Sequence, residues 1–323
     1  MNKRFVYFNG EFVEEKDAKI SIYDSALMFG DMVFEMTRSF NKKQFKLREH
    51  LERLYLGLKI LKIEINMSIE QLEEACLKTV EKNDPFFDSK DEHRLLINVS
   101  RGPLSIYHHA FTKVEPTIII ADFPLKWTVA SMSHLFDEGI NFFITSQRAI
   151  PAHLMDPKIK NRSRMWYQMA NIEVSNLKGE DNWALLLDTD GFISEGTGCN
   201  FFIIKDKKII TPLGKDLLRG ISRQYIFELS EQINLECIEK NIEPYDVYAS
   251  DEAFVTATPF CILPVKSLNN ILIQNGKMGN ITKMLLNKWS ENVGVDIIKQ
   301  IKEFGKEVHS HNLKGSTPYQ FKK

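Results

Sequence analysis

One acidic residue, Glu195, lies among small and apolar residues in the run WALLLDTDGFISEGTGCNFFII, which extends from Trp183 to Ile204. Burial of a carboxylate in such surroundings is unfavourable by several kcal/mol unless a cation or hydrogen-bond donors meet it. The position therefore predicts a cationic partner that the chain or a ligand supplies. The alternative is a solvent-exposed loop acid, which is the more common state of acids in glycine-rich loops.

Two lysines, Lys158 and Lys160, directly precede a helix-like segment in PKIKNRSRMWYQMANIEV. A lysine near a core becomes reactive when burial and a neighbouring cation favour its neutral amine, which can form a Schiff base with a carbonyl group. Arg162 and Arg164 are candidate neighbouring cations. The alternative interpretation is a solvated basic cluster at the start of a helix.

Three other places in the sequence could bind an anion. Gly220 precedes an amphipathic helix, so free backbone N–H groups at its start and the Ser222 hydroxyl could hold a phosphate. The run AFVTATPF offers a second hydroxyl-bearing turn at 256–258. Arg53 lies beside the apolar face of a helix in HLERL, where a buried guanidinium needs an anion, although it could instead extend to solvent.

Other familiar site patterns are absent from the sequence or incomplete in it. DTDG at 188–191 lacks the later ligands of a calcium loop, and GTG at 196–198 is too short for a dinucleotide-binding fingerprint. No GxxxxGK or GxSxG motif occurs. The histidines at 108, 109, 309 and 311 have no partner at metal-ligand spacing, so we expect no metal site.

Composition describes an ordinary globular chain of 323 residues, with 43% hydrophobic residues and a formal net charge of -1. The near-neutral balance gives no field that would gather nucleic acid or an anionic membrane, and no segment has the apolar length of a membrane span. The amino terminus lacks a complete signal peptide. The four cysteines, at 76, 199, 237 and 261, are scattered without CxxC spacing, so we expect a cytoplasmic protein with reduced thiols.

The N-terminal half has the pattern of an α+β domain. Asn9-Gly10 separates two short strand-like runs, which is the strongest short signal for a hairpin. Leucines at 47, 51, 54, 58 and 61 predict a helix that begins near Arg48. Ser68 fits the N-cap of a second helix, and strand-like runs at 94–100 and 116–122 end this half.

The C-terminal half is richer in strands. Strand-like runs occupy 140–145, 183–188, 199–204, 208–210, 235–239, 252–256 and 262–266, and helical segments occupy 163–177, 221–233 and 278–292. Short strands with irregular helical insertions favour a barrel-like or antiparallel sheet over a doubly wound one. We therefore divide the chain into a small α+β domain (1–123), a connector (124–135), a larger domain (136–298) and a polar C-terminal extension (299–323).

In this order, the motifs resemble those of the class IV aminotransferases, which are pyridoxal-phosphate enzymes. The class includes branched-chain and D-amino-acid aminotransferases and aminodeoxychorismate lyase. The resemblance runs from about Phe5 to about Asn292 and rests on YFNGEFV, SALMFGDMVFE, HLERL, GFISEGTGCNFF, LRGISR and AFVTATPFCILPV. It implies fold type IV, with a small N-terminal α/β sandwich, a larger barrel-like C-terminal domain, pyridoxal 5′-phosphate between them, and a homodimer.

The resemblance also implies roles for individual residues. Lys160 looks like the Schiff-base lysine, because its spacing to Glu195 and to the helix fits better than that of Lys158. Glu195 would pair with the protonated pyridine nitrogen. The residues implied to hold the phosphate are Arg53, Ile221, Ser222 and Thr258. The implied reaction is a ping-pong transfer in which Lys160 moves a proton between the substrate Cα and the cofactor, and an amino acid and a 2-oxo acid are the substrates.

Several positions depart from the family pattern. Branched-chain enzymes resemble EGAGEN and GTAAEI where this chain has EGTGCN and ATPFCI, and Pro259 offers no N–H to a substrate carboxylate. Their tyrosine shortly after the lysine is replaced locally by Arg164-Met165. We therefore hypothesise that an arginine binds the substrate carboxylate. The substrate-binding candidates are Phe29, Arg94, Arg101, Arg162, Arg164 and Ala257.

Three functions other than transfer between L-amino acids remain open on the sequence. A lyase of the aminodeoxychorismate lyase type could follow the same proton abstraction with elimination, and it would release pyruvate without accumulating pyridoxamine phosphate. A D-amino-acid or amine transaminase would differ in the donor that it accepts. A non-catalytic phosphate-ligand binder would be colourless after purification, and the intact Lys160 and Glu195 oppose that interpretation.

Overall fold

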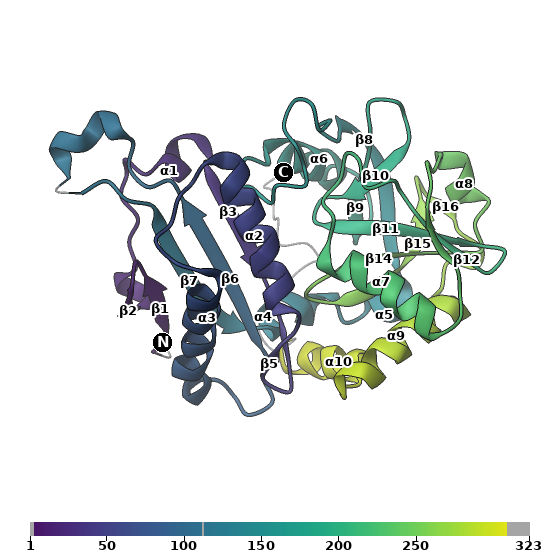
Figure 1. Cartoon of the computed structure of the whole chain (residues 1–323). Coiled ribbons are helices and arrows are strands. Elements are labelled where there is room, and N and C mark those ends of the chain that lie inside the picture. The colour runs from purple at the N-terminus through teal and green to yellow at the C-terminus, as the bar shows by residue number, and fades with distance from the viewer. Residues whose placement is uncertain (1–2, 112, 309–323) are drawn as a thin grey trace. The chain divides into compact units, whose positions relative to one another are not determined.

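The computed structural model describes residues 3–111 and 113–308, which form two compact units (Figure 1). The first unit comprises Met1–Leu125 and Ile159–Arg164, and the second comprises Lys126–Lys158 and Met165–Lys323. The sequence division places 159–164 in the larger domain, whereas the structure groups this segment with the smaller unit. Lys160 is therefore presented by the first unit.

The first unit is a five-stranded antiparallel sheet in the order β2-β1-β7-β6-β3, with helices on one face (Figure 1). Its elements are β1 (Phe5–Phe8), β2 (Glu11–Glu14), η1 (Glu15–Asp17), α1 (Ser25–Phe29), β3 (Met32–Met36), β4 (Ser39–Phe40), β5 (Lys43–Gln44), α2 (Leu47–Leu61), α3 (Ile69–Asn83), η2 (Asp84–Phe86), β6 (His93–Ser100), η3 (Ser105–Ala110) and β7 (Thr117–Pro124). Leu51 and Leu54 of α2 pack with Leu95 and Ile97 of β6, and all four are fully buried. Side chains alternate along a strand, so the even-numbered residues of β6 point to the other face.

Two local signals in the first unit are confirmed. Asn9 and Gly10 have φ values of 49° and 98°, as a tight hairpin turn requires, and β1 pairs with β2 on either side of them. Ser68 caps α3 through a capping box with Gln71, with hydrogen bonds of 3.3 and 2.8 Å. These short motifs therefore determine where their elements begin and end.

The second unit contains a closed barrel. Its strands run in the order β10-β9-β8-β15-β14-β11, and β10 also pairs with β11, which closes the six strands into a ring. The strands of this unit are β8 (Ile140–Arg148), β9 (Asn182–Leu187), β10 (Ile193–Gly196), β11 (Cys199–Lys205), β12 (Lys208–Thr211), β13 (Cys237–Glu239), β14 (Glu252–Ala257), β15 (Cys261–Leu268) and β16 (Ile271–Leu272). The prediction of a barrel-like rather than doubly wound sheet is confirmed.

Helices surround the barrel. They are α4 (Lys126–Val129), η4 (Ala130–Met132), α5 (Leu135–Glu138), α6 (Met165–Ser175), α7 (Ile221–Gln232), α8 (Pro244–Tyr248), α9 (Asn280–Val293) and α10 (Ile297–Val308). α6 packs on β8 and β9, and α9 packs on α7, β14 and β15. The predicted connector at 124–135 contains α4 and η4, which belong to the second unit.

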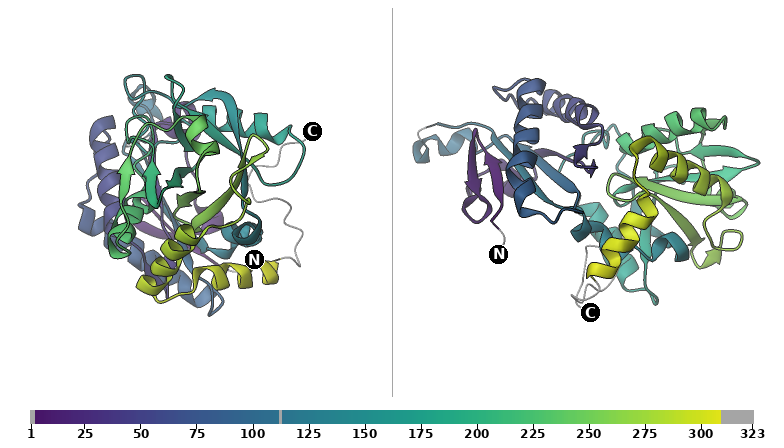
Figure 2. Two further views of the ribbon diagram at one scale, coloured as in Figure 1. Left: turned by 90° about the vertical axis from the view of Figure 1, so that its right-hand side faces the viewer. Right: turned by 90° about the horizontal axis from the view of Figure 1, so that it is seen from below.

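The composition of 299–323 predicts a polar extension, but its first part is helical. α10 places Ile297, Ile301 and Phe304 on one buried stripe, and it packs on α4 and η4 (Figure 2). Spacings of four and three residues produce this stripe, which the many lysines and glutamates around it conceal in the composition. Residues 309–323 lie outside the described part of the chain.

The cysteines are reduced thiols, as their spacing predicts. Cys76, Cys199 and Cys261 are buried, Cys237 is half-buried, and all four are free. Burial raises the pKa of the Cys237 thiol to about 12. Their thiols are therefore protonated at neutral pH and act as small apolar side chains.

Candidate active-site residues

Lys160 lies beside the edge strand β3 of the first unit. The Phe34 N–H donates to the Lys160 carbonyl at 2.9 Å, and the Arg162 N–H donates to the Met32 carbonyl at 3.0 Å. These two bonds extend the sheet past β3 by a short segment. The Lys160 ammonium lies 5.0 Å from the centre of the Phe34 ring.

The two arginines predicted to neighbour Lys160 do lie near it. The guanidinium carbons of Arg162 and Arg164 are 3.7 and 5.6 Å from the centre of the same Phe34 ring. Arg162 also donates to the Asn98 side-chain oxygen at 2.8 Å. The aromatic face is thus shared by three cations, and positive charge is concentrated where Lys160 is held.

Lys158 has a different environment from Lys160. It belongs to the second unit, where its ammonium is 2.8 Å from Asp156 and donates to the Lys215 carbonyl at 3.0 Å. This side chain is paired and half-exposed, which is typical of a surface lysine.

Arg53 meets a buried anion that sequence reasoning missed. Its guanidinium donates to both carboxylate oxygens of Glu35, at 2.6 and 2.8 Å, and His50 contacts the same carboxylate at 2.7 Å. Glu35 is fully buried on β3, while Arg53 and His50 come from α2. Burial opposes ionisation of Glu35, but Arg53 and His50 outweigh it and hold the pKa of Glu35 well below its usual value. Burial lowers the pKa of His50, and the nearby charges of Arg53 and Lys160 add to that effect.

Arg53→Met tests this buried pair in the cofactor-free protein. We expect the free energy of unfolding to fall by about 3–5 kcal/mol near neutral pH, because the Glu35 carboxylate loses its main counter-charge. The pKa of Glu35 is lowered on folding, so this contribution is present above the ordinary carboxyl range and is lost as pH falls below it. Urea unfolding at neutral and at acidic pH should therefore show a gap between the proteins that narrows in acid. Arg48→Met, which removes an exposed cation of the same helix, should change stability by under about 1 kcal/mol.

Arg94 has unsatisfied hydrogen-bonding groups. It is 8% exposed on β6, and its Nε and Nη1 groups have no hydrogen-bond partner among the described residues. Its Nη2 group lies 3.6 Å from the Met36 sulfur, which is a weak acceptor. Burial, and then the charge of Arg38, lower the pKa of Arg94. By strand alternation Arg94 and Asn98 lie on the sheet face that also carries Phe34, which pairs with Asn98 across β3 and β6.

The other first-unit candidates are engaged with protein groups. Arg101 donates to Asp31 at 2.6 Å and to the Leu61 carbonyl at 2.8 Å. Arg164 donates to the Asn161 carbonyl at 2.9 Å. Phe29 is 64% exposed, and its carbonyl accepts a hydrogen bond from Ser163 at 2.8 Å.

Glu195 is buried in the second unit, with 3% of its surface exposed, so the alternative of a solvated loop acid is wrong. Its Oε1 atom accepts a hydrogen bond from the Tyr167 hydroxyl at 2.5 Å. Its Oε2 atom accepts from the Asn200 amide at 3.3 Å and from the Leu218 N–H at 3.2 Å. The chain itself therefore supplies three neutral donors for this carboxylate.

Asn200 connects three parts of the second-unit site. In the strand register it lies opposite Glu195 of β10 on one side and Thr256 of β14 on the other. It also donates to the Leu218 carbonyl at 2.8 Å. A Cβ at Gly220 would lie 2.3 Å from the Asn200 side-chain oxygen, so only glycine fits at this approach. The barrel thus brings Glu195, the start of α7 and the end of β14 together.

Two hydroxyl groups near this point have no hydrogen-bond partner among the described residues. They are those of Ser222 and Thr258, whereas Thr256 donates to the Cys261 carbonyl at 2.6 Å. α7 begins at Ile221 after Gly220, without a side-chain cap, so its first N–H groups are open to an anion. Ala257 ends β14, directly before Thr258. Uncapped N–H groups with available hydroxyls form a donor set that suits a phosphate.

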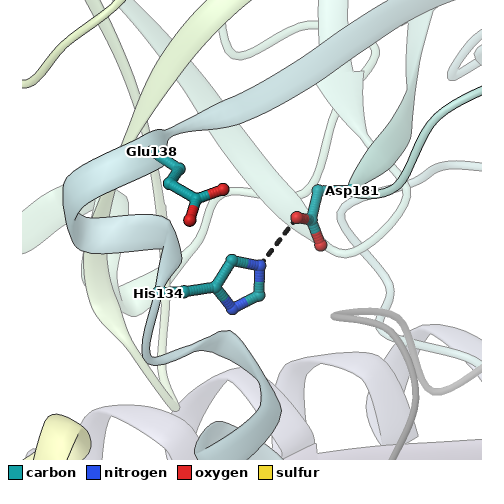
Figure 3. Close-up of side chains that lie close together, drawn as sticks. All are labelled: His134, Glu138 and Asp181. Atoms are coloured by element: carbon teal, nitrogen blue, oxygen red, sulfur yellow. Dashed lines mark hydrogen bonds and ion pairs between the residues drawn. The ribbon is translucent and has the colours of Figure 1, made fainter.

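A separate cluster of His134, Glu138 and Asp181 has the chemistry of metal ligands (Figure 3). One ligand atom from each lies within 4.8 Å of the others, and the His134 ring contacts Asp181 directly at 2.7 Å. The sequence search considered other histidines and missed this group. Its direct ion pair accounts for the arrangement, and exposed Glu138 makes a weak third partner.

Comparison with known proteins gives consistent results. The sequence model of the family Amino-transferase class IV matches residues 32–268. A Methanocaldococcus jannaschii protein, named as a candidate branched-chain-amino-acid aminotransferase, is 34% identical over 288 residues, which cover 88% of this chain and 95% of that protein. The crystal structure of Escherichia coli branched-chain amino acid aminotransferase superposes with a TM-score of 0.79 at 27% identity, covering 90% of this chain and 94% of that one. The crystal structure of the T.th. branched-chain amino acid aminotransferase with pyridoxamine 5′-phosphate has a TM-score of 0.80 at 25% identity, covering 90% and 95%.

Among the described residues, no helix is both long and apolar enough to span a membrane.

Proposed function

The chain belongs to the class IV aminotransferases, and we propose that it moves the amino group of a branched-chain L-amino acid to a 2-oxo acid. The names of its relatives support this choice of donor. The single observation that carries the catalytic assignment is Glu195, a carboxylate buried with three donors in the barrel. A buried anion so held is suited to pair with one further cation.

The residues described above fit pyridoxal 5′-phosphate, the cofactor of this family. The uncapped start of α7, the Ser222 and Thr258 hydroxyls and Arg53 match the phosphate, and Glu195 matches a protonated ring nitrogen. Gly220 leaves room that any Cβ would fill. When bound, this cofactor supplies an electron sink for the charge that develops at the substrate Cα.

Lys160 is the proposed catalytic base and the point of covalent attachment. It lies with Arg162 and Arg164 around Phe34, and a lysine amine among other cations gives up its proton more readily than one in water. As a free amine it takes the proton from the Cα of the amino substrate and returns it on the other side of the transfer. Backbone bonds from β3 fix its position.

Arg94 is the proposed contact for a substrate carboxylate. Its two buried N–H groups lack a partner among the described residues, and a carboxylate would satisfy them in bidentate fashion. Arg101, by contrast, is already engaged with Asp31. Pro259 offers no N–H, so an arginine replaces a backbone donor in this interpretation.

Arg94→Met should separate binding from folding. We expect KM for the 2-oxo acid to rise roughly 10- to 100-fold, because a charge-assisted contact is lost. We also expect the melting temperature to hold or rise, because the variant removes a buried cation whose hydrogen-bonding groups are unsatisfied among the described residues. Arg48→Met is the matched control and should leave KM unchanged. An unchanged KM together with a lower melting temperature would assign Arg94 a structural role.

A half-reaction screen tests the function as a whole. The purified protein is mixed with L-leucine, L-valine, D-amino acids or simple amines, and cofactor absorbance is followed. We expect the L-branched-chain donors to convert the cofactor fastest and 2-oxo acids to reverse the change. Faster conversion by D-amino acids or amines would overturn the donor assignment, and release of pyruvate without conversion would identify a lyase.

We infer that the protein works as a cytoplasmic homodimer. The four free thiols suit a reducing compartment. Apolar side chains of the first unit, including Leu27 and Phe29 at 64% exposure each, suit burial against a second copy. Light scattering during gel filtration should give twice the mass of 37.5 kDa.

A further inference from the structure

We propose that Tyr167 is a positioning residue for this reaction. Its hydroxyl holds Glu195 in the orientation and charge state in which Glu195 keeps a proton on the ring nitrogen of the cofactor. The inference rests on the proposed role of Glu195 and adds a residue that none of the sequence motifs contains.

The hydrogen-bond geometry gives Tyr167 a distinct place among the three donors. Its bond to Glu195 Oε1 is 2.5 Å, whereas the bonds of Asn200 and Leu218 to Oε2 are 3.3 and 3.2 Å. Tyr167 and Glu195 are 7% and 3% exposed, so water competes little for either. A hydrogen bond to an ionised acceptor is about twice as strong as a neutral one, and low local polarity strengthens it further.

Packing fixes the direction of the Tyr167 hydroxyl. The ring is packed among Phe143, Ala170, Val174 and neighbouring side chains, and Trp166 meets its edge at 5.3 Å. α6, which carries Tyr167, packs on β8 and β9 of the barrel. The donor therefore stays in place without a loss of conformational entropy during turnover, which is the requirement for a preorganised group.

The chemical consequence concerns a single proton. A donor on Oε1 stabilises the ionised carboxylate and lowers its affinity for a proton. The proton shared between Glu195 and the ring nitrogen then stays on the nitrogen, where it supports withdrawal of charge from the substrate Cα. Without the Tyr167 hydroxyl, the carboxylate attracts that proton more strongly, and the proton moves from nitrogen to Oε without any other bond changing.

Tyr167→Phe in the holoenzyme is the direct test. We expect kcat to fall by about tenfold or more, with KM for the amino donor within about twofold, because the lost bond serves a charged group during the chemical step. A second readout is the pH titration of the visible absorbance of the bound cofactor. Its midpoint should move to higher pH, because a ring nitrogen that has lost its proton withdraws less charge from the nitrogen of Lys160.

Tyr225→Phe is the matched control. Tyr225 is another buried tyrosine of the second unit, and its hydroxyl accepts a hydrogen bond from Asn292 at 2.9 Å rather than contacting Glu195. It should lower stability to a similar extent while leaving kcat and the titration midpoint unchanged. A purely structural role for Tyr167 would make the two variants alike.

Two further measurements keep the test decisive. In a Glu195→Gln background, Tyr167→Phe should lower kcat by no more than about threefold, because the charge that it serves is gone. If Tyr167→Phe does not fold, site-specific replacement by 3-fluorotyrosine keeps the packing and strengthens the donor, so the midpoint should move to lower pH. Equal midpoints for wild type, Tyr167→Phe or 3-fluorotyrosine, and Tyr225→Phe would overturn the inference. Failure of the wild type to exchange amino groups would instead overturn the proposed function.

Discussion

Lys160→Ala is expected to lower kcat by roughly 10⁴-fold or more, because the variant loses both covalent attachment and the proton-transferring amine. The Lys160 amine lies near Arg162 and Arg164 over Phe34, and no other lysine shares that ring in the described structure. Single-turnover mixing with L-leucine measures the chemical step directly. Borohydride reduction followed by peptide mass analysis should label wild type on the peptide that contains Lys160 and leave the variant unlabelled.

Lys158→Ala is the control for this prediction. It removes a lysine only two residues away, which is paired with Asp156 and belongs to the second unit. We expect kcat within about threefold of wild type, because a half-exposed ion pair contributes little. If Lys158→Ala abolished labelling while Lys160→Ala retained it, the catalytic assignment would pass to Lys158.

The fold could be predicted where side-chain spacing is strict. The four-residue and three-residue intervals of Leu51, Leu54 and Leu58 gave α2, and Asn9-Gly10 gave the first hairpin. The stripe of α10 has the same kind of spacing, yet lysine-rich composition hid it. Closure of the barrel through β10 and β11 depends on pairing between distant strands, which no local pattern encodes.

The site shows the same limit at the level of single residues. Glu195 was predictable as an acid in an apolar run, and the same rule applied to Glu35 in MVFEM would have predicted a cation such as Arg53. Tyr167 was not predictable, because a tyrosine on an amphipathic helix looks like ordinary core. Asn200 gains its place from the strand register that sets it opposite Glu195.

Glu195→Gln is expected to lower kcat by roughly 10²- to 10³-fold, which is the usual loss when one preorganised electrostatic contact is removed. Glutamine keeps the shape of the side chain but has no charge to hold a proton on the ring nitrogen. Lys160 and the phosphate-binding groups are untouched, so the variant should stay yellow and should retain labelling by borohydride. Equilibrium dialysis and stopped-flow half-reactions measure the two properties separately.

Glu252→Gln shows whether charge at Glu195 in particular is required. Glu252 is also a partly buried acid of the barrel, but its carboxylate caps α9 through the Ile281 and Thr282 N–H groups, at 2.9 and 2.8 Å. Its replacement should weaken the helix cap and leave kcat within about twofold. The three donors around Glu195 could equally stabilise a carboxylate whose only task is to hold β10, Tyr167 and Leu218 together. In that case Glu195→Gln would lower stability and spare turnover, so the ratio of the two effects, compared with Glu252→Gln, decides between a structural and a chemical carboxylate.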